Sequence, residues 1–137
     1  VRSPKVYVRD SGLVHALLGL GDREAVLGHP VAGTSWEGFV IEQLLSVLPP
    51  RAEAWFYRTS AGAEIDLLLD LGPKRRWAIE VKRSIGAPHP SQGFHLAAAD
   101  VGATRKIVVY PGREAYRLDP TTEVVPLGVI AREVAGT

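Results

Sequence analysis

The clearest alternation of hydrophobic and polar residues lies between positions 63 and 84, which read AEIDLLLDLGPKRRWAIEVKRS. A period of two predicts β-strands, because successive side chains of a strand point to opposite faces of the sheet. The first predicted strand places Ile65, Leu67 and Leu69 on one face and Asp66 on the other. The second carries Glu80, and the intervening Leu-Gly-Pro-Lys supplies a turn. We therefore expect two adjacent strands with acidic side chains near the middle of a sheet.

The rest of the pattern predicts helices and strands in mixed order. The predicted helices are 11–19, 35–48 (ended by two prolines), 91–101 and 127–134. The other predicted strands are 5–8, 54–58, 105–110, 114–118 and 123–125. The segment 28–35 is rich in Gly, Pro and Thr and predicts a loop. This order favours an α/β fold with a mixed central sheet and helices on its two faces.

Composition narrows the class of protein. A chain of 137 residues with 46% hydrophobic residues forms one hydrophobic core. The absence of Cys excludes disulfides and thiolate metal sites, and a reducing cytoplasm is the default expectation. No apolar run approaches the ~18 residues of a membrane span, so no membrane partner is expected. The first residue is Val and the chain has no Met, so we expect a piece of a longer protein.

The main candidate functional residues are Asp66 and the Glu80-Val81-Lys82 tripeptide. Paired strands would bring the two carboxylates and the ammonium group onto one face. Hard carboxylate oxygens suit Mg²⁺ (or Mn²⁺), which lowers the pKa of an attacking water and stabilises charge on a phosphate. Buried charges are costly, so the alternative is a structural ion-pair network. Lys82 would orient the water or neutralise the phosphate, and Gln92 would support the site from the next helix.

Two further acids have competing interpretations. Glu37 lies on the apolar side of the helix at 35–48, where it either joins the site or forms a capping box with Thr34. Glu64 is either a further ligand or the partner of Arg58.

These residues resemble the PD-(D/E)xK nuclease superfamily in order and type. More narrowly, the segments SPKVYVRDSGL, SWEGFVIEQLL and FYRTSAGAEIDLLLD followed by WAIEVKRS are similar to DUF4143. That domain of unknown function follows an AAA+-type ATPase in many prokaryotic proteins, and the resemblance covers most of residues 3–110. One departure is Ile65, which replaces the Pro before the Asp of the superfamily motif.

The resemblance implies a restriction-endonuclease-like fold over residues 29–137, with residues 1–28 as the tail of a preceding domain. It implies Glu37, Asp66, Glu80 and Lys82 as catalytic residues, with Asp66 and Glu80 as metal ligands. The expected partners are nucleic acid, the protein's own ATPase domain and a second copy of the chain. No GxxxxGKS/T motif occurs, so ATP is expected to bind only to the absent ATPase half.

Family resemblance predicts the fold more strongly than the activity. The residues leave three functions open. The first is a metal-dependent phosphodiesterase on DNA or RNA, the second is a non-catalytic nucleic-acid-binding or protein-interaction module, and the third is an assembly domain for the ATPase. A basic surface around the clusters 74–76, 82–83 and 105–106 would favour the first two, although the net charge is only +1.

Overall fold

The computed structural model describes residues 10–137, and the predicted strand at 5–8 lies outside this range. The elements follow in the order α1 (Ser11–Leu17), α2 (Arg23–Gly28), α3 (Val31–Ser46), β1 (Glu53–Arg58), β2 (Glu64–Asp70), β3 (Arg76–Val81), α4 (Gln92–Asp100), β4 (Arg105–Tyr110), β5 (Tyr116–Asp119), β6 (Thr122–Pro126) and α5 (Leu127–Ala135). Within residues 10–137, no helix is both long and apolar enough to cross a membrane.

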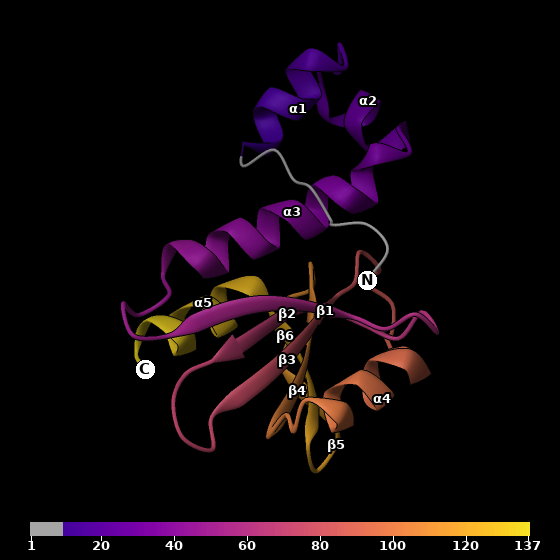
Figure 1. Ribbon diagram of the computed structural model, residues 1–137. Coiled ribbons are helices and arrows are strands. Elements are labelled where there is room, and N and C mark those ends of the chain that lie inside the picture. Colours follow the sequence, from indigo (N-terminus) through magenta and orange to yellow (C-terminus); the bar gives the residue numbers. More distant parts are fainter. Residues whose placement is uncertain (1–9) are drawn as a thin grey trace.

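The strands form one mixed six-stranded sheet in the order β1-β2-β3-β4-β6-β5 (Figure 1). β1, β2 and β3 are mutually antiparallel, whereas β4 runs parallel to β3 and β6 runs parallel to β4. A parallel neighbour requires a crossover, and α4 provides it between β3 and β4. The predicted α/β fold with a mixed sheet flanked by helices is therefore confirmed.

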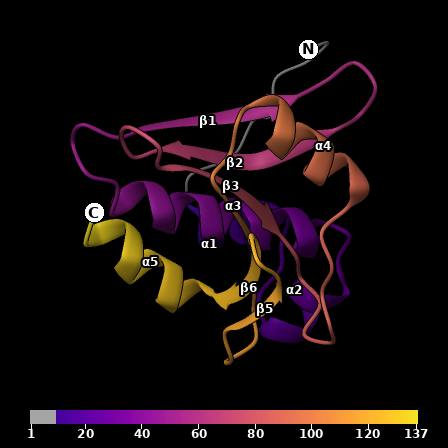
Figure 2. The same cartoon turned by 90° about the horizontal axis from the view of Figure 1, so that it is seen from below.

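Helices cover both faces of the sheet. α3 and α5 lie side by side over one face, as both views show (Figure 1, Figure 2), and α4 covers the other. On the first face, Leu44 of α3 and Ile130 of α5 pack with Leu69 and Ile79 in the larger hydrophobic core. On the second face, Phe94 of α4 belongs to a smaller cluster together with strand side chains. Both faces of β2 and β3 are thus buried, which makes any charge on them expensive.

The strict alternation expected for β2 is interrupted by a bulge. Trp55 pairs with Leu68 and Tyr57 pairs with Ile65, so β2 holds one more residue than β1 between these pairs. As a result Ile65 packs with Leu68 and Phe94 on the α4 face, rather than on the opposite face with its predicted neighbours. The expectation that Ile65 lies on the same face of the sheet as Leu67 and Leu69 was wrong. The reason is that a bulge shifts the side-chain register by one position.

The N-terminal helices also differ from the predicted ones. α3 begins at Val31, within the segment predicted as a loop, because Pro30 already has a helical backbone (φ −55°, ψ −25°) and opens the helix. The short helix α2 was not predicted, although Asp22 caps it by accepting a hydrogen bond from the Ala25 amide at 2.8 Å. α1 and α2 both contact α3, and the His15 Nε2 lies 2.6 Å from the Ser35 hydroxyl.

Candidate functional site

Asp66 lies where β2 and β3 stop pairing. The last paired residues are Leu67 and Ile79, and the bulge of β2 contains Asp66. Just beyond this point the Asp66 Oδ2 accepts a hydrogen bond from the Val81 amide at 2.8 Å. The carboxylate therefore takes the place of a main-chain acceptor from β2. Its side chain is buried, with 7% of the residue exposed, and this contact offsets part of the cost of burial.

Glu80 uses both carboxylate oxygens. Its Oε1 lies 2.8 Å from the Lys82 ammonium, and its Oε2 accepts a hydrogen bond from the Ser91 amide at 3.0 Å. Ser91 is the N-cap of α4, whose hydroxyl accepts a hydrogen bond from the Phe94 amide. A carboxylate at the amino end of a helix is favoured by the partial positive charge there. Glu80 therefore joins β3 to α4 and to the following lysine.

Both main-chain polar groups of Lys82 form hydrogen bonds. Its amide donates to the Val109 carbonyl at 2.9 Å, and its carbonyl accepts from the Trp36 indole Nε1 at 3.0 Å. Trp36 belongs to α3, so this contact ties the helix to the end of β3. The structure thus brings Asp66, Glu80 and Lys82 to one end of β2 and β3, and the expectation that all three share one face of the sheet stays a prediction.

Glu37 follows Trp36 in the interior of α3 and is partly buried. The predicted capping box with Thr34 is wrong, because α3 begins at Val31 and Glu37 lies well beyond its first turn. Glu37 nevertheless has an interaction partner of its own. Its role as a catalytic residue stays a prediction.

The two supporting candidates occupy different positions. Glu64 forms an ion pair with Arg58, with 3.2 Å between Oε2 and Nε, which is the structural partner considered from the sequence. Gln92 is the first residue of α4 and is exposed. It is next to Ser91, so it borders the Glu80 contact, and its role in holding nucleic acid stays a prediction.

The donor set limits the kind of metal site that could form. Among residues 10–137, no three His, Asp or Glu side chains are grouped to hold a metal ion. In donor type, the carboxylates of Asp66 and Glu80 suit Mg²⁺, an ion that commonly accepts one or two protein carboxylates and several waters. They do not fit a three-carboxylate site that includes Glu37. A cation would also have to share Glu80 Oε1 with the Lys82 ammonium 2.8 Å away.

The three basic clusters divide between the two ends of β3. Arg76 begins β3 and Lys82 follows its end, which separates the two clusters by roughly 20 Å of extended chain. Arg76 is paired with Asp70, with 2.7 Å between Nη2 and Oδ2. Hydrogen bonds from Arg76 and from the Gly72 amide hold the pKa of Asp70 below its usual value. Lys106 lies 3.1 Å from the His95 Nδ1. The structure therefore separates the basic cluster at 82–83 from those at 74–76 and 105–106, which lie at the same end of β3 and β4.

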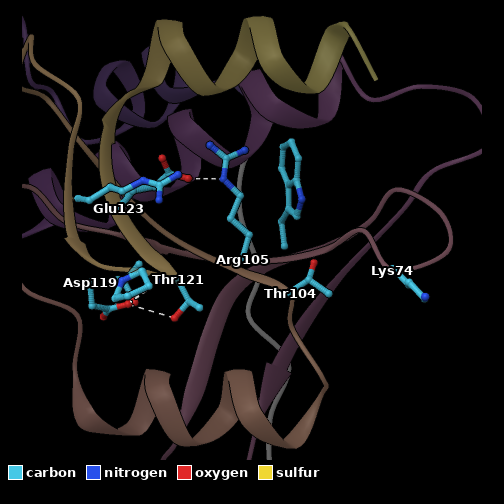
Figure 3. A pocket seen from close by; sticks show the side chains of 10 residues that line it. Lys74, Thr104, Arg105, Asp119, Thr121 and Glu123 are labelled. Atoms are coloured by element: carbon cyan, nitrogen blue, oxygen red, sulfur yellow. Dashed lines mark hydrogen bonds and ion pairs between the residues drawn. The ribbon is translucent and has the colours of Figure 1, made fainter.

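A second charged cluster lies at the opposite end of the sheet, where β3, β4 and β6 begin. Arg105 forms ion pairs with Glu123 of β6 and Glu133 of α5 (Figure 3 shows Arg105 beside Glu123). Its guanidinium also stacks on the Trp77 ring, 4.5 Å from the centroid. Burial opposes the charge, but the bonds to the two carboxylates prevail and raise the pKa of Arg105. Sequence reasoning missed this cluster, because its members are distant in the chain and match no motif.

The chain belongs to the family described as "Domain of unknown function (DUF4143)", which matches residues 32–130. It is 42% identical over 125 residues to an uncharacterized protein of Mycobacterium tuberculosis and to one of Mycobacterium bovis. The matches cover 91% of this chain and 28% of each relative, so the chain spans just over a quarter of their length.

Among solved structures, the chain is similar to part of an assembly of Thermococcus gammatolerans McrB AAA+ hexamers with bound McrC. The identity is 16% and the TM-score is 0.46, with 69% of this chain and 27% of the other covered. At that TM-score the likeness supports no conclusion about function.

Proposed function

We propose that this domain serves an AAA+-type ATPase as a non-catalytic protein-interaction module. Membership of the DUF4143 family supports this, because the domains that this sequence resembles follow such ATPases. The relatives are also much longer than this chain, which leaves room in them for a further domain. In this proposal ATP binds to the ATPase part, and the present domain gives that part a docking and regulatory surface.

The observation that carries the non-catalytic assignment is the way the acidic residues are used. Asp66 closes the gap between β2 and β3, and Glu80 connects β3 to α4. These contacts join three elements of the fold, and Lys82 supplies the charge that balances Glu80. The use of Arg76 and Arg105 in ion pairs with carboxylates supports the same assignment, since binding of nucleic acid depends on neutralising several phosphates together.

The second candidate function is a Mg²⁺- or Mn²⁺-dependent phosphodiesterase acting on DNA or RNA. The observation in its favour is that two buried carboxylates and a lysine occur in the order that the PD-(D/E)xK resemblance implies. Asp66 and Glu80 would hold the ion, which would supply Lewis-acid stabilisation of charge on the phosphate. Lys82 would hold the attacking water, and Glu37 and Gln92 would support the site from α3 and α4.

A cleavage assay separates the two functions. Branched, single-stranded and duplex nucleic acids are incubated with the chain and Mg²⁺ or Mn²⁺, and with the longer protein that contains the ATPase part. We expect no cleavage above the level of the Asp66→Asn and Lys82→Met variants. Metal-dependent cleavage that both substitutions abolish would replace the proposed function with the phosphodiesterase.

The accessory role has its own test in the longer protein. Removal of this domain is expected to change the rate of ATP hydrolysis or the assembly of the ATPase, measured by phosphate release and sedimentation. If both are unchanged, the domain does not serve the ATPase.

A further inference from the structure

A large apolar hollow lies between α1, α2, α3 and the segment after β3. It has a volume of about 650 Å³, and Val26, Leu27, Trp36, Phe39 and Ile85 are among its lining residues. Three of these apolar side chains remain well exposed: Leu27 at 45%, Phe39 at 41% and Ile85 at 69%. Exposed apolar side chains gathered around one hollow are typical of a binding surface. We refer to this hollow as the α2–α3 groove.

The charge of the α2–α3 groove has one sign. Arg23 and Arg83 line it together with His15, and none of the residues within 10–137 that line it is Asp or Glu. The Arg83 Nη2 donates a hydrogen bond to the Leu27 carbonyl at 3.2 Å, which fixes the guanidinium beside the apolar floor. A partner that pairs with both arginines therefore needs carboxylates beside its apolar anchors.

The backbone around the groove restricts how a partner binds. Most lining residues belong to α1, α2 and α3, whose main-chain groups are largely used within the helices. Among residues 10–137, no strand of the sheet lines the groove, which disfavours a partner that binds by adding a strand. A segment that enters must satisfy its own backbone hydrogen bonds, as a helix does. An amphipathic helix also places its apolar anchors along one face.

We propose that the α2–α3 groove docks an acidic amphipathic helix of a protein partner, with apolar side chains against Phe39 and Leu27 and carboxylates on Arg23 and Arg83. This rests on the proposed function as an interaction module and names the chemistry of its partner. The groove adjoins the candidate site, since Trp36 lines it and also holds the Lys82 carbonyl. Nucleic acid is disfavoured, because two arginines beside an apolar hollow neutralise few phosphates.

The test uses a fluorescent model helix of roughly 16 residues, long enough to be helical, with Leu and Phe on one face and Glu along its flanks. A second peptide carries Lys in place of each Glu. We expect fluorescence anisotropy to show that the Glu peptide binds. The affinity of the Lys peptide should be weaker by a factor of roughly ten or more. Arg23→Glu together with Arg83→Glu should invert this preference, whereas Arg75→Glu, an exposed charge reversal in the β2–β3 turn, should not.

Equal binding of the two peptides, or binding unaffected by the Arg23 and Arg83 reversals, would overturn the proposal. Tighter binding of single-stranded DNA, lost on Phe39→Ala, would assign the groove to nucleic acid instead. Self-association lost on Phe39→Glu, measured by sedimentation, would assign it to a second copy. Circular dichroism confirms that each variant folds. The peptide assay needs no metal, so nuclease activity would overturn the proposed function and leave this assignment standing.

Discussion

Two clusters of charged side chains, one buried and one partly exposed, lie at opposite ends of the central strands, and they are built differently. At one end Arg105 is held between Glu123 and Glu133 and stacks on Trp77. These contacts join side chains of β4, β6 and α5 to one another. At the other end the carboxylates bind main-chain amides, as Asp66 does with that of Val81.

The comparison shows that buried charge in this sheet does not by itself indicate catalysis. The Arg105 cluster matches no motif, yet it is as fully paired as the cluster that resembles an active site. The Asp66 end differs in its position in the sheet. The strands β2 and β3 diverge there, so backbone amides of β3 require acceptors that the main chain of β2 no longer supplies. We therefore expect both clusters to behave as structural connections, with different energetics.

The largest effect is expected at Arg105. Arg105→Met would leave Glu123 and Glu133 without their cation and remove the stacking on Trp77. Because the side chain is about a quarter exposed (23%), we expect a loss of about 2–4 kcal/mol in the free energy of unfolding, somewhat less than for a fully buried pair. Urea denaturation measures it. Arg75→Met, an exposed control, should change stability by less than about 0.5 kcal/mol. Similar losses of stability in both variants would contradict a structural role for the ion pairs of Arg105.

A smaller effect is expected at Asp66. Asp66→Ala leaves the Val81 amide without its acceptor and should cost about 1–3 kcal/mol. Asp66→Asn keeps an oxygen acceptor of the same shape and should cost less. Amide hydrogen exchange at Val81 reports the contact directly, and it should accelerate in Asp66→Ala more than in Asp66→Asn. If the two variants are equally stable and exchange equally, Asp66 is not held for this hydrogen bond.

The smallest effect concerns an exposed pair near the start of β3. The pKa of Asp70 lies below its usual value because of Arg76, so the charged form is favoured by folding. This contribution is present above the unfolded pKa of about 4 and is lost as pH falls through the lower folded value. An NMR titration should show the Asp70 pKa rising toward the usual value in Arg76→Met. An unchanged pKa would contradict the assignment.

Much of the fold could be predicted from hydrophobic periodicity. The strand at 105–110 matches β4 at both ends, and the helix predicted at 91–101 contains α4 with Ser91 as its cap. The bulge in β2 could not be predicted, because it depends on how β1 pairs with β2 rather than on a local residue. The early start of α3 was missed because Gly33 and Thr34 are weak helix formers, and contacts with α1 and α2 outweigh their propensity.

Within the candidate site, the proximity of Glu80 and Lys82 was predictable, but the hydrogen bonds of the carboxylates were not. Alternation along β3 placed Glu80 and Lys82 together, and their ion pair confirms it. The hydrogen bond from Ser91 to Glu80 depends on where the loop before α4 returns to the sheet. The separation of Arg76 from Lys82 follows from the predicted strand itself, because six residues of extended chain span roughly 20 Å.

The most direct test of the structural account is a Mn²⁺ titration followed by NMR. A paramagnetic ion held by Asp66 and Glu80 would broaden the amide signals of Val81 and Ser91 before others. The account predicts no selective broadening there at millimolar Mn²⁺, with the same result in the Asp66→Asn variant. Selective loss of these two signals, reversed by Mg²⁺ and absent in Asp66→Asn, would contradict it and establish a metal site.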